Sequence, residues 1–165
     1  PLLVLSALLQ DGRASRFYRG LVEGREIATD VSGGFNPFQS AAFYEGTTMF
    51  LTKVSYRRGV PHEKVLAALD EEISSIAKKG VSEAELSRLK TRILAALYAG
   101  MESRMELAVE LAEATAFDGA PDGLLTLPAR IAAVTPNDVK RAASWLSKEA
   151  RVVIVKKPGE EGQKP

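Results

Sequence analysis

The sequence predicts a single domain of the α+β class, and two kinds of periodicity support this prediction. Apolar residues recur every three or four positions in about six segments, which is typical of amphipathic helices. About three shorter segments are rich in β-branched and aromatic residues, which is typical of strands. The chain has 165 residues, of which 45% are hydrophobic and 26% are charged, and this suffices for one buried core. We expect residues 1–157 to form the domain and residues 158–165 to form a disordered tail.

The first third of the chain is expected to hold two helices followed by two strands. Leucines at helical spacing predict a short, buried helix over residues 2–9. Ser15 is placed to cap a second helix, which Gly24 would end. Residues 26–35 alternate as in a strand that runs into a glycine-containing loop, and residues 47–56 are rich in β-branched and aromatic side chains.

A helix and the start of another are predicted next. Pro61 fits a first helical position, and apolar residues at helical spacing continue to Gly80. Ser82 and Glu85 have the pattern of a capping box. In that motif the serine hydroxyl accepts a hydrogen bond from the backbone of Glu85, and the glutamate carboxylate accepts one from the backbone of Ser82. We therefore expect a helix to begin at this point.

This helix is predicted to be long, reaching residue 118. If continuous it would be a rod of roughly 50 Å, and Gly100 is the expected bend point. Its apolar stripe is expected to pack in the core. The stripe consists of Leu86, Leu89, Ile93, Leu97, Met101, Met105, Ala108, Ala112 and Ala116.

The end of the chain predicts two short helices and a closing strand. A helix is expected over residues 122–132, and Thr135 provides an N-cap for a last helix that ends near Leu146. Residues 150–155 are expected to form the strand. Three strands are few for so many apolar helix faces, so a further strand is expected to precede Pro1.

Composition excludes several classes of function. The net charge is +1 at pH 7, so there is no basic excess to favour a nucleic acid or an anionic membrane as partner. The chain has no cysteine and one histidine, which excludes disulfides and any site within the chain that needs two imidazoles. The longest apolar run, residues 2–9, is too short to span a membrane, and no basic segment precedes it as in a signal peptide. The localisation therefore stays unassigned.

Residue types that often act in catalysis have simpler structural explanations here. His62 lies in the first turn of a predicted helix, where a lone histidine is most often solvated. The carboxylates around Asp70 and Glu83 fit a solvated helix face and a helix first turn. The turns around Gly12 and Gly33 lack the glycine spacing and the Lys-Ser/Thr pair of a phosphate loop. We therefore expect no catalytic residue and no metal ligand in this chain.

A local basic run is a surface feature with a functional interpretation. It consists of Arg13, Arg16, Arg19 and Arg25, interleaved with Phe17 and Tyr18. On a helix, Arg16 and Arg19 would share a face able to bind a carboxylate or an acidic partner. The alternative, which the residues alone favour, is solubility together with local salt bridges to Glu23 and Glu26.

Four segments of the chain occur in a recognisable order. Leu8–Tyr18 combines a helix end, a glycine turn and a Ser-Arg-aromatic segment, and Lys79–Lys90 begins with Lys-Gly-Val-Ser-Glu-Ala-Glu-Leu. Ala133–Val139 and Val152–Val155 follow at similar spacing. Together these segments resemble the non-catalytic, C-terminal domain of the pitrilysin/insulinase family of zinc metallopeptidases, the inverzincins.

The resemblance implies a fold and a setting. The fold would be a metallohydrolase-like domain in which a mixed, mostly antiparallel sheet is backed by helices, with its first strand upstream of Pro1. Paired domains of this kind enclose a chamber that traps unfolded peptides. The family's zinc motif, His-x-x-Glu-His, cannot occur in this chain, so the resemblance implies zinc only for the parent protein or a partner. The Arg and Tyr with which second domains of many relatives bind substrate fall here on Val22 and Thr29.

We therefore expect this chain to be the non-catalytic C-terminal domain of a zinc-dependent endopeptidase and to be inactive alone. It would wall the peptide chamber and pack on a zinc-bearing domain or partner subunit. Two alternatives stay open: a non-peptidase scaffold in a larger complex, and a peptide-binding module that uses a sheet edge. Unfolded peptide is the expected substrate. Nucleic acid and membrane are not expected partners, whereas the edge left by the missing strand would favour a homodimer. Arg16 and Tyr18 are the residues expected to contact substrate or partner.

Overall fold

The computed structural model describes residues 1–37, 40–146, 148–149 and 151–156, so the tail expected over 158–165 lies outside the described residues. The α+β class is confirmed. In chain order the elements are α1 (Leu2–Gln10), η1 (Tyr18–Gly24), β1 (Ala28–Phe35), β2 (Phe50–Tyr56), α2 (His62–Lys79), α3 (Glu83–Met101), α4 (Arg104–Asp118), α5 (Asp122–Ala132) and α6 (Pro136–Ser144). No helix in these ranges combines the length and the apolar character that a membrane span requires.

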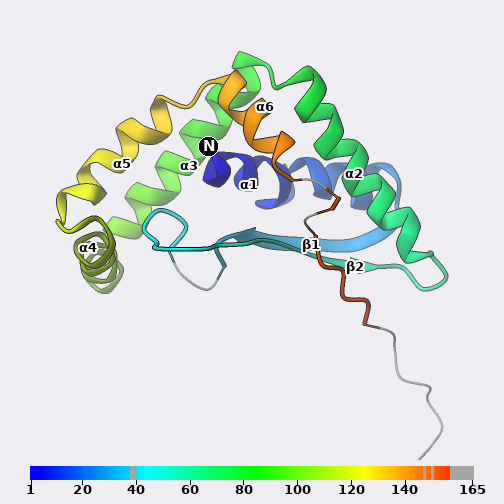
Figure 1. The fold of residues 1–165 in the computed structure, drawn as a ribbon, viewed down its shortest axis with the longest axis horizontal. Helices are drawn as coiled ribbons and strands as arrows, with labels where there is room; N and C mark the ends of the chain where they lie inside the picture. The colour runs from blue at the N-terminus through cyan, green and yellow to red at the C-terminus, as the bar shows by residue number, and fades with distance from the viewer. Residues whose placement is uncertain (38–39, 147, 150, 157–165) are drawn as a thin grey trace, which may run out of the picture.

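The sheet is an antiparallel pair of β1 and β2, with helices on one side of it (Figure 1). Its register runs from Phe35 opposite Phe50 to Ala28 opposite Tyr56, with an irregularity near the second pair. Alternate residues of β2 pack against the core, and the residues between them are exposed. One face of the sheet is therefore covered by helices while the other is open, as period-two alternation requires.

The core lies between the covered face and the helices. α1 packs on β1, α3 and α6, while α6 also packs on α2. The apolar spacing noted in the sequence explains these contacts, because each helix turns one apolar face inward. The largest fully buried apolar side chains are Phe17, Phe43, Leu5, Leu9, Leu21, Ile76, Leu86 and Leu124.

Two buried polar side chains of α1 fix the position of the strand pair. The Gln10 amide nitrogen donates to the carbonyl of Leu51 at 2.9 Å, and its oxygen accepts from the Thr52 hydroxyl at 2.7 Å. The Ser6 hydroxyl accepts from the backbone N–H of Phe35 at 3.0 Å. Because buried polar groups are costly unless paired, these bonds restrict how α1 can slide along the strands.

The two predicted helix caps have different outcomes. Thr135 and Asp138 form a complete capping box, in which each side chain accepts from the other residue's backbone. Ser82 accepts from the backbone of Glu85 at 3.2 Å, which confirms half of the second box. The other half is wrong, because the Glu85 carboxylate binds Arg16 instead.

The long helix expected up to residue 118 is not continuous, and its break lies just after the expected bend at Gly100. α3 ends at Met101, and the Ser103 hydroxyl caps α4 by accepting from the backbone of Glu106 at 3.3 Å. The stripe is buried at the start of α3 but exposed along α4, where Met105 is 74% exposed. The expectation of core packing therefore fails beyond the break, because α4 takes a new direction and turns a different side inward.

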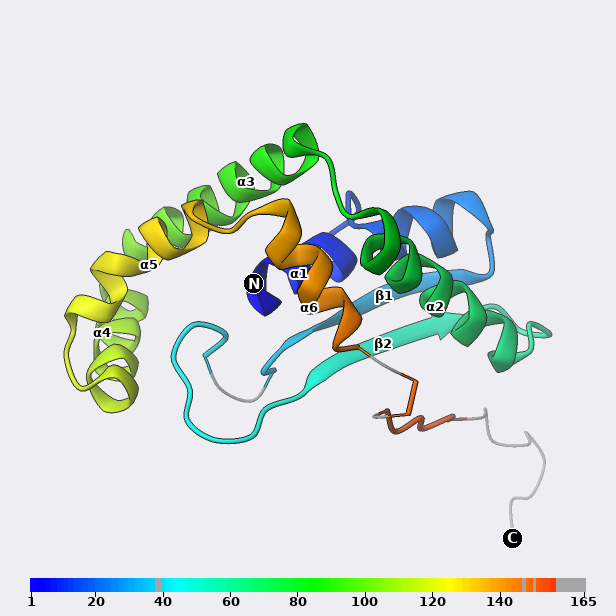
Figure 2. The ribbon, with the colours of Figure 1, turned by 45° about the horizontal axis from the view of Figure 1, so that its top comes forward.

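The second predicted helix is formed and ends at Gly24; over Tyr18–Gly24 it is a π-helix, in which the backbone N–H of Arg25 donates to the carbonyl of Gly20. One further expectation needs correction. The closing strand expected over residues 150–155 is absent from described residues 151–156, which run past β2 without joining it (Figure 2). Val152 and Ile154 are each 89% exposed, and the sheet formed by the described residues contains β1 and β2 alone. The strand expected upstream of Pro1 stays a prediction.

Candidate functional site

Arg16 lies just before η1 and is bound to α3. Its Nε donates to Glu85 Oε1 at 3.0 Å, and its Nη2 donates to Glu85 Oε2 at 2.7 Å. Both side chains are largely shielded from solvent, being 24% and 29% exposed. The planar guanidinium fork is thus matched to a carboxylate, and the carboxylate-binding capacity predicted for Arg16 is used within the chain. Sequence reasoning missed Glu85 as its partner, since Glu85 gave only a capping signal.

Two other arginines of the basic run, Arg25 and Arg13, also have partners. Arg25 donates to Glu71 of α2 at 2.5 Å, and the Arg13 guanidinium lies 5.6 Å from the centroid of the Tyr18 ring. The local ion pairs expected with Glu23 and Glu26 do not form among the described residues. Half-buried Tyr18 therefore has a cation on its ring.

A groove of about 270 Å³ lies between α1, α3 and the end of β1. It exposes Gly33 and Gly34, whose lack of side chains leaves the strand backbone accessible. At Phe35, however, the outer backbone N–H of β1 is already bound by Ser6. A peptide that added to this edge as a new strand would have to displace that hydrogen bond.

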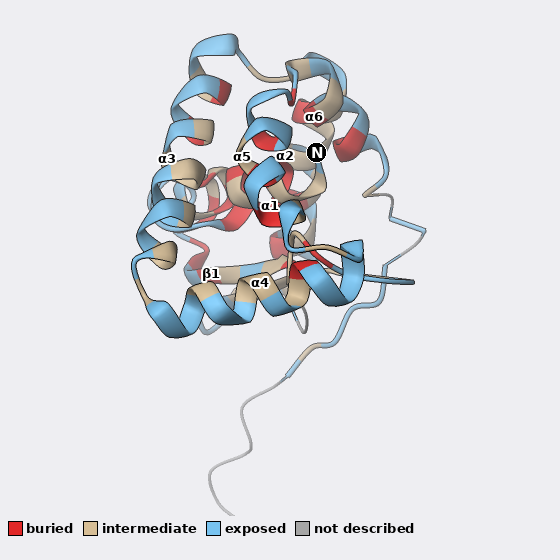
Figure 3. Ribbon diagram, turned by 90° about the vertical axis from the view of Figure 1, so that its left-hand side faces the viewer, coloured by how far each residue is buried: buried red, intermediate tan, exposed pale blue. Residues whose placement is uncertain are grey.

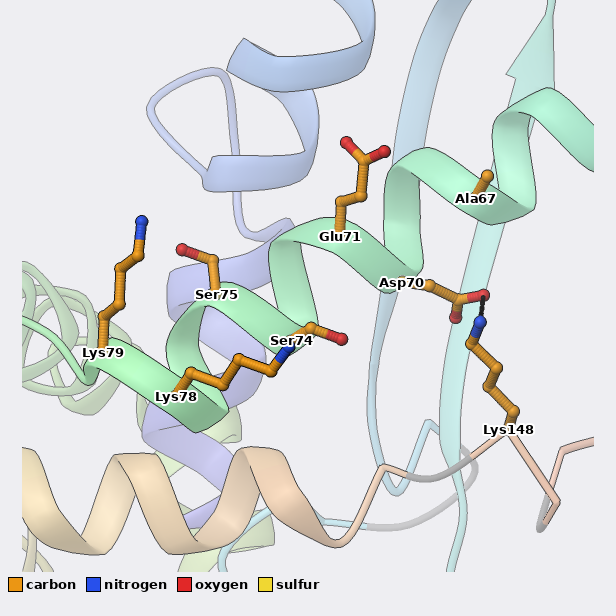
Figure 4. A pocket seen from close by; sticks show the side chains of 8 residues that line it. All are labelled: Ala67, Asp70, Glu71, Ser74, Ser75, Lys78, Lys79 and Lys148. Atoms are coloured by element: carbon orange, nitrogen blue, oxygen red, sulfur yellow. Dashed lines mark ion pairs between the residues drawn. The ribbon is translucent and has the colours of Figure 1, made fainter.

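A shallower depression of about 480 Å³ lies on α2 (Figure 4). Its acidic centre is Asp70, whose carboxylate binds Arg151 at 2.6 Å and lies 3.4 Å from Lys148 Nζ. Ser74 and Lys78 line the depression farther along the helix (Figure 4). The single negative charge of Asp70 is thus paired with two cations of the same chain, and these ion pairs link the segment after α6 to α2.

The residues that the structure describes do not fit a zinc ion. His62 is at the first helical position of α2, and its Nε2 lies 3.2 Å from Glu63 Oε1. Across the ranges that the structure describes, no three His, Cys, Asp or Glu side chains gather as metal ligands would. Val22 packs against the core and the Thr29 hydroxyl donates to the carbonyl of Ser55 at 3.1 Å. Neither position offers an arginine or a tyrosine to a substrate.

Comparisons with known proteins agree with this picture. A family model described as "Peptidase M16 inactive domain" matches residues 1–93. Crystal structures from two Bordetella species, each described as from a "putative zinc protease", superimpose on the chain. The B. pertussis Tohama I structure has a TM-score of 0.72 and 24% identity, over 92% of this chain and 80% of that one. The B. parapertussis structure, of the inactive peptidase domain, has a TM-score of 0.74 and 23% identity, over 98% and 85%.

A protease from Helicobacter pylori has the same fold within a longer chain. Its TM-score is 0.74 at 20% identity, over 87% of this chain and 33% of that one. The present chain therefore spans about a third of that protease. At these identities the structural matches establish the fold alone. No curated protein sequence matches the chain.

Proposed function

This chain belongs to the family of peptidase M16 inactive domains, and from that premise we propose that it is the non-catalytic C-terminal domain of a zinc-dependent endopeptidase. The observation that carries the proposal is the family match over residues 1–93, which includes the whole strand pair and α2. Its contribution to proteolysis would be burial and positioning of an unfolded peptide. Zinc and the groups that activate water would come from another domain or a partner subunit, since the residues here do not fit the metal.

The open face of the sheet is the surface that we assign to the peptide chamber. Lys53, Ser55 and Thr29 are exposed on the strands, and no helix covers this side (Figure 1). This uncovered face, on which Leu51 is also exposed, suits a chamber wall, because an unfolded peptide brings its own backbone donors and acceptors together with apolar side chains and needs no fixed pocket. The covered face supplies the rigidity.

Arg16 and Tyr18 are proposed to lie at the contact with substrate or partner. The bidentate bond to Glu85 holds Arg16 in place, so the ring of Tyr18 is the more available of the two. Tyr18→Ala should weaken association with the zinc-bearing partner while leaving the thermal midpoint nearly unchanged. Tyr98→Ala, at a 54% exposed position of α3, is the matched control. Equal effects of the two variants would remove Tyr18 from the interface.

Three other interpretations are kept as outcomes of experiment. The peptide-binding module is less favoured, since Ser6 already binds the β1 edge at Phe35. A homodimer through a free sheet edge predicts a mass that rises with concentration in light scattering, and a monomer at all concentrations would exclude it. A scaffold relative would share this fold but would occur in an assembly without peptidase activity.

Cleavage of reduced, unfolded casein tests the proposal. Native protein that contains this domain should cleave casein, lose activity with a chelator and regain it with zinc. The 165-residue chain alone should cleave nothing under the same conditions. Chelator-sensitive cleavage by the isolated chain would overturn the assignment of a non-catalytic domain, and an inactive native assembly would favour the scaffold.

A further inference from the structure

Helix α4 presents an apolar row to solvent. Met105, Val109, Ala112 and Ala116 recur at spacings of four, three and four residues, which places them on one face of a helix. All four residues are exposed, Met105 by 74% and Val109 by 48%. At 1.5 Å per residue the row is about 16 Å long. Figure 3 shows α4 crossing the lower part of the molecule with much of its ribbon exposed.

The opposite side of α4 makes its contacts with the domain. Ala114 is fully buried, and Leu107 and Leu111 are partly buried against the core. These residues face α3 and α5, the elements on which α4 packs. The apolar row therefore points away from the fold, although its spacing continues the stripe that is buried in α3. A contiguous apolar row of this kind is typical of an interaction surface.

A row of carboxylates borders the apolar row. Glu106, Glu110 and Glu113 are spaced by four and three residues, so they also share one helix face. Burial, and then the charges of Glu113 and Glu106, raise the pKa of the Glu110 carboxyl above its usual value. None of the three carboxylates has an ion pair within the part of the chain that the structure describes. The row thus holds negative charge that the domain itself leaves unbalanced.

We propose that these two rows, the α4 surface, dock an amphipathic helix of a partner protein whose apolar face is bordered by lysine or arginine. The two apolar faces would bury one another, and the partner's cations would neutralise the glutamates. This inference extends the proposal that the domain packs on another domain or subunit. It rests on that proposal for the statement that the partner is a protein. It assigns to α4 a surface distinct from the open sheet face.

A pair of synthetic helices tests the chemistry of this surface. The first is a fluorescein-labelled peptide of 18 residues with leucines at helical spacing and lysines along one border, and the second has glutamate in place of lysine. In fluorescence anisotropy at 0.15 M salt, the lysine peptide should bind the full chain saturably, with a dissociation constant at least about tenfold lower than that of the glutamate peptide. Hydrogen exchange should slow in residues 104–118 when the lysine peptide is bound.

Variants distinguish binding at the α4 surface from nonspecific binding of the peptide elsewhere on the chain. Val109→Arg should weaken binding of the lysine peptide by about tenfold or more, whereas Val152→Arg, at an exposed apolar position after α6, should leave it unchanged. Glu110→Gln with Glu113→Gln should remove most of the preference for lysine over glutamate. Circular dichroism checks folding, and Met105→Lys replaces Val109→Arg if the latter unfolds, because Met105 is the more exposed position.

The proposal is overturned if the lysine peptide does not bind, if both peptides bind alike, or if the two arginine variants lose binding equally. Protection elsewhere than in residues 104–118 would also overturn it. These results concern only the α4 surface. Failure of the proposed function would instead appear as a native assembly that is inactive toward casein, so the two failures can be told apart.

Discussion

Replacement of Gly33 by alanine should destabilise the strand pair far more than replacement of its neighbour Gly34. Gly33 has a φ of +149°, a region that costs a residue with a side chain about 1–3 kcal/mol. An added Cβ would overlap the backbone carbonyl of Leu51 and would lie 2.9 Å from Gln10 Oε1. Because the first obstacle is backbone, relief requires a shift of β2, and overpacking of this kind costs about a further 1–3 kcal/mol.

The expected loss in the free energy of unfolding is therefore roughly 4 kcal/mol, the middle of the summed ranges. For a domain of this size that corresponds to a fall in the thermal midpoint of about 8–16 °C. Gly34 has no positive φ, and an added Cβ there meets nothing within 4 Å. Gly34→Ala should accordingly stay within about 1 kcal/mol of the parent protein.

Urea unfolding followed by circular dichroism at 222 nm measures both variants. Gly33→Ala should unfold at a lower urea midpoint with a similar slope, and Gly34→Ala should give a nearly unchanged curve. If the two variants lie within about 1 kcal/mol of each other, the close approach of β1, β2 and Gln10 is not what holds the strand pair in place.

Four other predictions follow from individual contacts. In a double-mutant cycle, Arg16→Ala and Glu85→Ala should couple by about 1 kcal/mol, and a coupling near zero would show that the bidentate pair does not stabilise the fold. The backbone N–H and hydroxyl of Thr135 lower the pKa of Asp138. Its stabilising contribution is therefore present above the unfolded-state pKa and lost as pH falls through the folded value, so Asp138→Asn should lower the thermal midpoint at pH 7 but not in strong acid. Burial and two neighbouring glutamates raise the pKa of Glu110, which penalises its charged form. Glu110→Gln should therefore melt higher than the parent at pH 7, with an advantage that disappears in acid; a constant difference would contradict this origin. EDTA should not change the thermal midpoint of the chain, and a tightly bound stoichiometric metal would refute the conclusion that its residues do not fit zinc.

Local signals in the sequence account for most helix boundaries. Thr135, Pro136 and Asp138 predict the start of α6 because the cap is formed by residues within one turn. The β-branched and aromatic residues over 47–56 likewise predict the strand that forms over Phe50–Tyr56. The break between α3 and α4 also has a local signal that the apolar stripe obscured, since Ser103 and Glu106 repeat the spacing of a capping box.

What could not be predicted depends on residues distant in the chain. Arg16 and Glu85 are 69 positions apart, so neither residue's local pattern identifies the other. Residues 151–156 have the composition of a strand, but a strand needs a partner with which to share backbone hydrogen bonds. The exposed row on α4 illustrates the same limit. Apolar spacing indicates that a helix face favours burial. Whether the face is buried within this domain depends on the tertiary structure.

The identity of the native polypeptide tests the central claim most directly. We would recover the protein from its source extract with an antibody against this domain, then determine its intact mass and peptide map together with those of any stoichiometric companion. The account predicts a His-x-x-Glu-His sequence upstream in the same polypeptide or in the companion. A native assembly in which no polypeptide contains that motif would contradict the assignment to a zinc endopeptidase.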